Sequence, residues 1–312
     1  MATVKLRYYV AAISSTVIWG FFSIPLRGLK AYPADQILHY RIFTSLLITW
    51  VAIGFFKRKA FRSDLSHFKQ LDAASKGKLI WLILIAGMLI TGNWFSFIYA
   101  VNNVSLKSAA FAYMVCPLIT AVGGFLILKE HLTSLKLIAV GVALISILIL
   151  TRGSLDEVSW SVFIASLYAF YLIIQRAVQS IDKLVMLGIQ LFISSILIFP
   201  LFIYHFDGVP SGYHFWLNIL LISSVFTIIP LFLSLYALVG MPSSTLGILI
   251  YINPVVSFSV AFFYFDEGIN EVQAIAYGLL LIAVIIFNWA VIKGLLFKKN
   301  LPETPYVDVP IE

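Results

Sequence analysis

The chain has 312 residues, of which 61% are hydrophobic and 11% are charged, and its formal net charge is +7. Soluble domains carry roughly 25% charged residues, so a single aqueous core could not bury this much apolar surface, and the composition indicates a membrane protein. The sole cysteine, Cys116, excludes a disulfide framework and a cysteine-based metal site.

Apolar runs long enough to cross about 30 Å of hydrocarbon, on the order of 20 helical residues each, can be placed ten times. They centre on residues 8–27, 36–56, 79–101, 106–128, 133–151, 158–178, 185–205, 213–236, 243–265 and 271–292. Backbone groups find no water in lipid, so each run is predicted to be a helix, and the alternation typical of a barrel is absent. The predicted fold class is an all-α integral membrane protein with ten transmembrane helices.

The second half of the sequence repeats the first, at a shift of 149 residues in its early part and 137 in its later part. The matched residues include Trp19-Gly20-Phe21 with Tyr168-Ala169-Phe170, Cys116-Pro117 with Asn253-Pro254, and Glu130 with Glu267. The basic loop Lys57–Lys78 is predicted to be the insertion that makes the two shifts differ. Five spans per half is an odd number, so the second half is predicted to enter the membrane inverted. We therefore expect two inverted five-helix repeats, residues 1–152 and 153–297, and a disordered tail over residues 298–312.

The distribution of basic residues predicts the orientation. With the N-terminus inside, 16 of the 21 lysines and arginines fall on the inner side. The remaining five, on or near the outside, are Arg27, Lys30, Arg41, Lys107 and Arg152. Basic residues favour the cytoplasmic side, so both termini are predicted to be cytoplasmic. The net positive charge is then a topology signal and an attraction to anionic lipid headgroups, and nucleic-acid binding is not needed to explain it.

Short motifs occur along nearly all of residues 5–295. They are Trp19-Gly20, the segment Pro33–Arg41, Gly92-Asn93-Trp94, Tyr99–Asn103, Tyr113–Pro117, and Ser244–Gly247 running on to Tyr251–Pro254. Their combination resembles the EamA group of the drug/metabolite transporter superfamily, and within it the RarD branch. The resemblance implies a ten-helix permease of the inner membrane, and related branches export amino acids and other small metabolites. Cys116 stands where that branch usually has asparagine, so polarity at this depth is expected from Asn253 alone.

Polar side chains inside apolar spans are costly, which makes them candidates for substrate binding. Arg41 lies about five residues into the second predicted helix, roughly 7 to 8 Å below the outer boundary, where its planar donors could hold a carboxylate. Snorkelling to the outer headgroups is the equal alternative. The candidate binding residues are Trp19, Arg41, Asn93, Trp94, Tyr113, Tyr168, Gln190, Tyr251 and Asn253. Each could instead serve helix packing or an interfacial belt.

Inverted repeats further predict that Trp94, Tyr113 and Tyr251 surround one central cleft between the halves. Two further matched pairs are candidates for hinges and gates. Pro117 and Pro254 each free a backbone carbonyl, so they could act as hinges, although fixed kinks are common in membrane helices. Glu130 and Glu267 are predicted to end helices at opposite faces and could act as gates. Solvation, or pairing of Glu130 with its neighbour Lys129, is the alternative.

These features predict a secondary transporter that exports a small amphipathic metabolite, amino acid or drug by alternating access. The sequence contains no nucleotide-binding or hydrolase motif, and the pair Asp35 and His39 has no third ligand for a metal. No cofactor, metal or nucleic-acid partner is expected; the expected partners are a small-molecule substrate and the bilayer. A lipid or lipid-linked sugar flippase and an intramembrane enzyme or receptor remain as alternatives, and the coupling ion and oligomeric state stay open.

Overall fold

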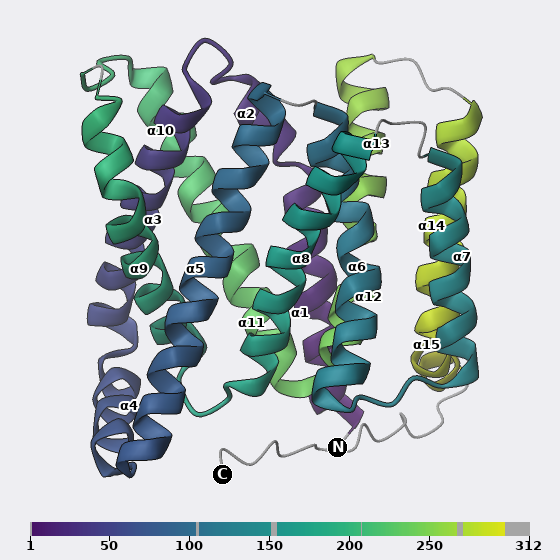
Figure 1. The fold of residues 1–312 in the computed structure, drawn as a ribbon, viewed down its shortest axis with the longest axis horizontal. Helices are drawn as coiled ribbons and strands as arrows, with labels where there is room; N and C mark the ends of the chain where they lie inside the picture. Colours follow the sequence, from purple (N-terminus) through teal and green to yellow (C-terminus); the bar gives the residue numbers. More distant parts are fainter. Residues whose placement is uncertain (1, 104–105, 151–154, 207, 267–270, 297–312) are drawn as a thin grey trace.

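The computed structural model describes residues 2–103, 106–150, 155–206, 208–266 and 271–296. Every regular element within these ranges is a helix (Figure 1). The elements are α1 (Ala2–Gly20), α2 (Ser23–Arg27), α3 (Ala34–Phe56), α4 (Arg58–Gln70), α5 (Ala73–Asn103), α6 (Leu106–Leu128), α7 (Ser134–Leu150), α8 (Leu155–Ala177), α9 (Lys183–Tyr204), α10 (Tyr213–Ser223), the π-helix η1 (Ser224–Ile228), α11 (Ile229–Gly240), α12 (Ser243–Leu249), α13 (Ile252–Phe265), α14 (Glu271–Phe287) and α15 (Trp289–Leu296).

Seven helical segments are long and apolar enough to cross a bilayer, and three further apolar helices are shorter within the described residues. The chain is therefore a multi-pass membrane protein. Three of the long segments are irregular. Leu6–Arg27 contains the break between α1 and α2, Tyr213–Gly240 contains η1, and Ser243–Phe265 contains the break between α12 and α13. Helices lie within each predicted apolar run, whereas the count of ten spans and the inverted repeat stay predictions.

Helix α4 corrects one expectation, because the stretch Lys57–Lys78 was predicted to be a loop. It contains the 13-residue helix α4 and the start of α5. The physical reason is an apolar face at helical spacing, on which Phe61, Phe68 and Leu71 pack against a buried cluster that includes Met186. The predicted insertion is thus a folded element.

Helices from the first half of the chain pack chiefly on helices from the second half. The principal pairs are α6 with α8, α7 with α14, α1 with α11 and α13, α3 with α9, and α5 with α8 and α9. The start of α1, α4 and α15 lie at one end of the molecule, here called the inner end, and α2 and the start of α10 lie at the opposite, outer end (Figure 1). The space between these ends is therefore bounded by helices from both halves.

Candidate functional site

Arg41 lies among aromatic rings about two turns into α3 from the outer end. Its Nε donates a hydrogen bond of 2.8 Å to Thr227 Oγ1, and its guanidinium carbon lies 5.0 Å from the centre of the Trp94 ring and 5.4 Å from that of Phe22. No carboxylate among the described residues forms an ion pair with it. A half-buried guanidinium that keeps most of its donors unpaired favours an anionic ligand.

The hydrogen-bond acceptor for Arg41 belongs to the π-helix η1. Thr227 lies within η1 and donates its own hydroxyl proton to the carbonyl of Ile222 at 2.9 Å, which orients Oγ1 toward the guanidinium. Pro230 has no N–H, so the carbonyl of Phe226 has lost its usual helical partner. Trp19 Nε1 donates to this carbonyl at 3.0 Å. Single-turn π-helices are frequent at functional sites, and this one supplies two polar contacts to the first half of the chain.

Aromatic side chains continue the site away from Arg41. The Tyr168 ring lies 6.1 Å from Trp19 and 6.4 Å from Tyr113, measured between ring centres and in edge-to-face geometry. The structure therefore brings together five candidate residues, from α1, α3, α5, α6 and α8. They are Trp19, Arg41, Trp94, Tyr113 and Tyr168. We call these five residues with Thr227 the Arg41 cluster.

The other candidates lie outside this cluster and have packing contacts. Asn93 is buried and donates from Nδ2 to the carbonyl of Ile164 at 2.9 Å, so it joins α5 to α8. Ser257 Oγ donates to Asn253 Oδ1 at 3.5 Å within α13. Tyr251 is fully buried at the break between α12 and α13, and its hydroxyl has no hydrogen-bond partner among the described residues. For Asn93 and Asn253 these contacts match the helix-packing alternative.

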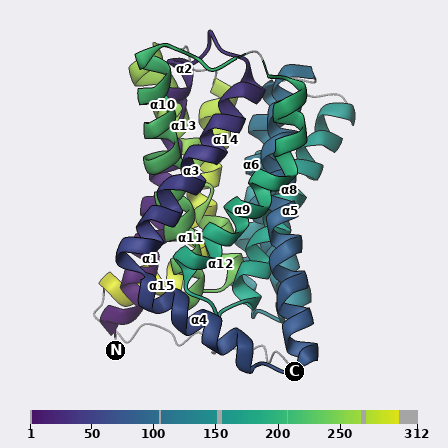
Figure 2. The same cartoon turned by 90° about the vertical axis from the view of Figure 1, so that its left-hand side faces the viewer.

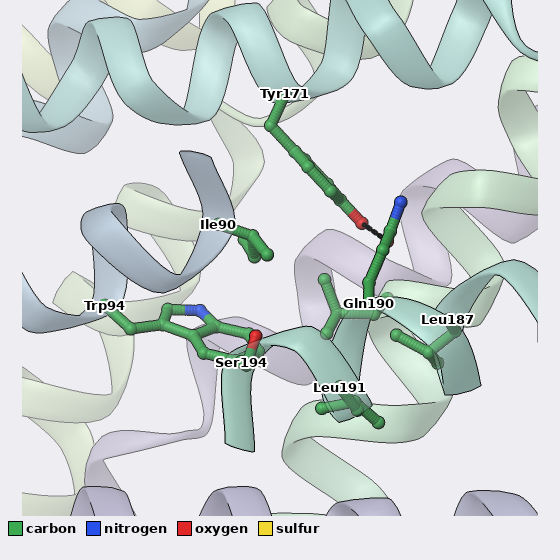
Figure 3. Close-up of a pocket in the computed structure, with 8 residues that line it drawn as sticks. Ile90, Trp94, Tyr171, Leu187, Gln190, Leu191 and Ser194 are labelled. Carbon is green, nitrogen blue, oxygen red and sulfur yellow. Dashed lines mark hydrogen bonds between the residues drawn. The ribbon is translucent and has the colours of Figure 1, made fainter. Parts of the chain in front are cut away.

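Gln190 lines a narrow gap beside Trp94 (Figure 3). The space between these side chains is too narrow to admit a water molecule. Its lining residues are Ile90, Trp94, Tyr171, Leu187, Gln190, Leu191, Ser194 and Leu231. Tyr171 donates to Gln190 Oε1 at 3.1 Å, while Gln190 Nε2 has no partner within the described residues. Trp94 thus contacts both this narrow gap and the guanidinium of Arg41.

A buried carboxylate joins the two halves at the inner end. Glu130 Oε1 accepts hydrogen bonds from Ser243 N at 2.6 Å and Ser243 Oγ at 2.8 Å, and Oε2 accepts from Ser244 N at 2.9 Å. These donors form the N-terminus of α12, which favours negative charge. We call Glu130, Ser243 and Ser244 the inner latch. Glu130 is only 7% exposed, so the solvated alternative considered for it is wrong.

The two candidate hinges differ from each other. Helix α6 runs through Pro117 without interruption. Pro254 instead follows the break at Ile250 and Tyr251, where α12 ends and α13 begins.

Glu267, the candidate gate at the outer face, and the tail 298–312 lie outside the described residues. In the part of the chain that the structure describes, no group of three His, Cys, Asp or Glu residues could hold a metal ion.

Comparisons with known proteins identify the family and the fold of the chain. The sequence profile of the EamA-like transporter family matches residues 6–152 and again residues 157–289. Protein RarD of Escherichia coli is 26% identical over 88% of this chain and 92% of its own length. An uncharacterized transporter of Pseudomonas aeruginosa is 28% identical over 97% of this chain and 99% of its own. A protein of known crystal structure, 17% identical, has the same fold with a TM-score of 0.71, covering 90% of this chain and 97% of that one.

Proposed function

Because the chain belongs to the EamA-like transporter family, we propose that it exports a small amphipathic molecule with an anionic group across the inner membrane. Ten membrane helices in two inverted five-helix repeats, with both termini cytoplasmic, would carry out alternating access. The family profile, which matches once in each half, and the basic residues of α4 at the inner end support this arrangement. Energy would come from an ion gradient or from the gradient of the substrate itself.

The proposed substrate class rests on the few partners of the Arg41 guanidinium among the described residues. Its guanidinium has one hydrogen bond, to Thr227, and no ion pair among the described residues. A carboxylate would bind the remaining donors in a bidentate manner and neutralise the charge. The rings of Trp19, Tyr113 and Tyr168 would contact the apolar part of the same molecule. An amino acid or a related carboxylate metabolite has both features.

The inner latch supports a gating step in this cycle. The latch connects Glu130, shortly after the end of α6, to the start of α12. These two helices therefore cannot separate at the inner end while the three hydrogen bonds persist. We assign the latch to a conformation closed toward the inner side. Glu267, the matched residue of the second half, would close the outer side in the opposite conformation.

A thermal-shift experiment with paired ligands tests the substrate class. The detergent-solubilised protein is heated with amino acids and with the matching amines that lack only the carboxylate, such as tryptophan and tryptamine. A ligand at 100 times its Kd stabilises the folded state by about 2.7 kcal/mol, which is readily measured as a higher melting temperature. We expect stabilisation by at least one carboxylate ligand and none by its amine.

The variant Arg41→Lys makes this test specific. Lysine keeps the charge and loses the bidentate fork, so the shift caused by the carboxylate ligand should be largely lost while the melting temperature without ligand changes little. Arg62→Lys, on the exposed face of α4, is the matched control and should bind as wild type does. An unchanged ligand shift in Arg41→Lys, or equal shifts with acid and amine, would show that Arg41 does not bind the substrate.

A further inference from the structure

Helix α4 interrupts the repeat and takes no part in the Arg41 cluster or the inner latch. It runs obliquely across the inner end between α3 and α5 (Figure 2). Phe61, Phe68 and Leu71 pack on the protein, and the opposite face is exposed. Any role of α4 beyond packing therefore depends on its exposed face.

The charged side chains on the exposed face of α4 are all basic. At 3.6 residues per turn, Arg58, Arg62 and Lys69 fall within an arc of about 40°, and Lys59 falls within about 100° of Arg58. All four side chains are exposed. Asp64, the one carboxylate on α4, points to the protein, where its Oδ2 accepts a hydrogen bond of 3.1 Å from Asp182 N. The four cations thus have no acidic neighbour on their own helix face.

The neighbouring residues place this face at the level of the lipid headgroups. Phe55 and Phe56, at the end of α3, are 81% and 85% exposed, and Trp81, early in α5, is 64% exposed. Tryptophan is enriched at the boundary between hydrocarbon and headgroups, and exposed phenylalanines at the end of a membrane-spanning helix insert into the adjoining acyl region. Lys57 and α4 follow this boundary directly, so the basic face meets the headgroup layer.

We propose that Arg58, Lys59, Arg62 and Lys69 form a binding surface for anionic phospholipid headgroups at the inner end. Clustered basic residues next to a membrane helix attract anionic lipid electrostatically, and the amphipathic form of α4 presents four of them on one side. This inference depends on membrane insertion and not on the substrate proposed above.

Polar contacts connect this surface to the second half of the chain. Lys57 Nζ lies 2.8 Å from Asp182 Oδ2. The other carboxylate oxygen of Asp182 accepts hydrogen bonds from Leu184 N and Val185 N, and so caps α9. A lipid that holds α4 in place therefore also holds the start of α9, and binding should stabilise the whole fold.

Lipid titration of the melting temperature tests the proposal. The full-length protein in detergent is titrated with dioleoylphosphatidylglycerol, with dioleoylphosphatidylcholine and with inorganic phosphate. We expect the anionic lipid to raise the melting temperature and the zwitterionic lipid and phosphate to have little effect. Each basic residue near an anionic surface changes affinity about fivefold, so Arg58→Gln/Arg62→Gln should raise the half-saturating lipid concentration about 30-fold.

Arg58→Gln alone should raise the half-saturating lipid concentration about fivefold. The matched control is Lys30→Gln, which removes one charge from an exposed position just after α2, at the outer end. It should titrate as wild type does. The proposal is overturned if the α4 variant and wild type respond to phosphatidylglycerol alike, or if phosphatidylcholine stabilises equally. Equal stabilisation by phosphate would identify a free anion as the ligand and would also overturn membrane docking.

Discussion

Glu130→Gln is the substitution that we expect to change the conformational equilibrium most. Glutamine keeps the shape of the side chain and one acceptor oxygen, but it removes the charge and replaces the second oxygen with an NH₂ group. Whichever way the amide turns, this NH₂ group faces a donor, because Ser243 N and Ser244 N bond to different carboxylate oxygens. The inner latch thus loses at least one hydrogen bond and its attraction to the N-terminus of α12.

The size of the effect follows from these contacts. A hydrogen bond to a charged group contributes about 1.5 to 3 kcal/mol, and a charge at a helix N-terminus contributes up to about 1 kcal/mol. Glu130 is 7% exposed, so solvent screens these terms little. The loss of one such bond and of the charge should cost about 2 to 4 kcal/mol. The population open at the inner end should then rise by a factor of about 30 to 1,000.

The sole cysteine gives an assay that needs no knowledge of the substrate. Cys116 is 1% exposed, and α12 covers the next turn of α6, where a Cβ on Gly247 would lie 2.7 Å from Thr120 Cβ. Separation of α6 from α12 should expose the thiol to a maleimide. When opening is rapid, the alkylation rate is proportional to the open population, so Glu130→Gln should react about 30 to 1,000 times faster.

Two further variants control this experiment. Ser243→Ala removes one of the three hydrogen bonds and should accelerate alkylation less than Glu130→Gln. Glu271→Gln makes the same chemical change at an exposed position and should have no effect. Melting temperature and gel-filtration elution must show that each variant stays folded. If folded Glu130→Gln reacts at the wild-type rate, the latch does not keep the inner end closed, and the reasoning is refuted.

Three other predictions concern the inner end. A methyl group at Gly124 would lie 2.6 Å from Glu130 Oε2 and 2.8 Å from Ser243 Oγ, so Gly124→Ala should disrupt the inner latch and speed alkylation of the sole cysteine. Gly141→Ala, whose methyl group would have no atom within 4 Å, should leave the rate unchanged. Burial raises the pKa of Asp64 above its usual value, so the folded state favours the protonated form and stability falls as pH rises through the folded-state pKa. From about pH 4 upward the melting temperature of the wild type should therefore fall relative to that of Asp64→Asn. A cysteine at position 69, in a chain without the native one, should be shielded from an impermeant reagent in intact cells; labelling there would reverse the proposed orientation.

The sequence was sufficient to predict helical structure in each apolar run, though not in α4, because lipid leaves a backbone few alternatives to helical hydrogen bonding. It also suggested Arg41 and Trp94 as neighbours of a site, since polar tips in apolar spans are rare. The role of Thr227 was missed, although a local signal existed. Pro230 has no N–H, so it leaves the carbonyl of Phe226, four residues earlier, without its helical partner. This proline therefore predicts an irregular turn around Phe226, next to Thr227.

The burial of Glu130 could not be predicted from its sequence neighbours. A carboxylate beside Lys129 near a helix end is ordinarily solvated. Its actual partners, Ser243 and Ser244, lie more than a hundred residues away, and only the packing of α12 on α6 brings them together. The same holds for α4, whose apolar face was recognisable but whose partner surface, around Ile181 and Met186, belongs to the other half.

The two halves contribute different chemistry to the hydrogen bonds of the Arg41 cluster and the inner latch. The first half supplies side chains with strong donors or acceptors, namely Trp19, Arg41 and Glu130. The second half supplies the groups around irregular helices, which are the Phe226 carbonyl and Thr227 of η1 and the N-terminus of α12. An irregular helix can change its hydrogen bonding at lower cost than a regular one, since some of its backbone groups already lack helical partners. We therefore expect the conformational change to concentrate at η1 and at the break beside Tyr251, while the first half retains the side chains that bind and lock.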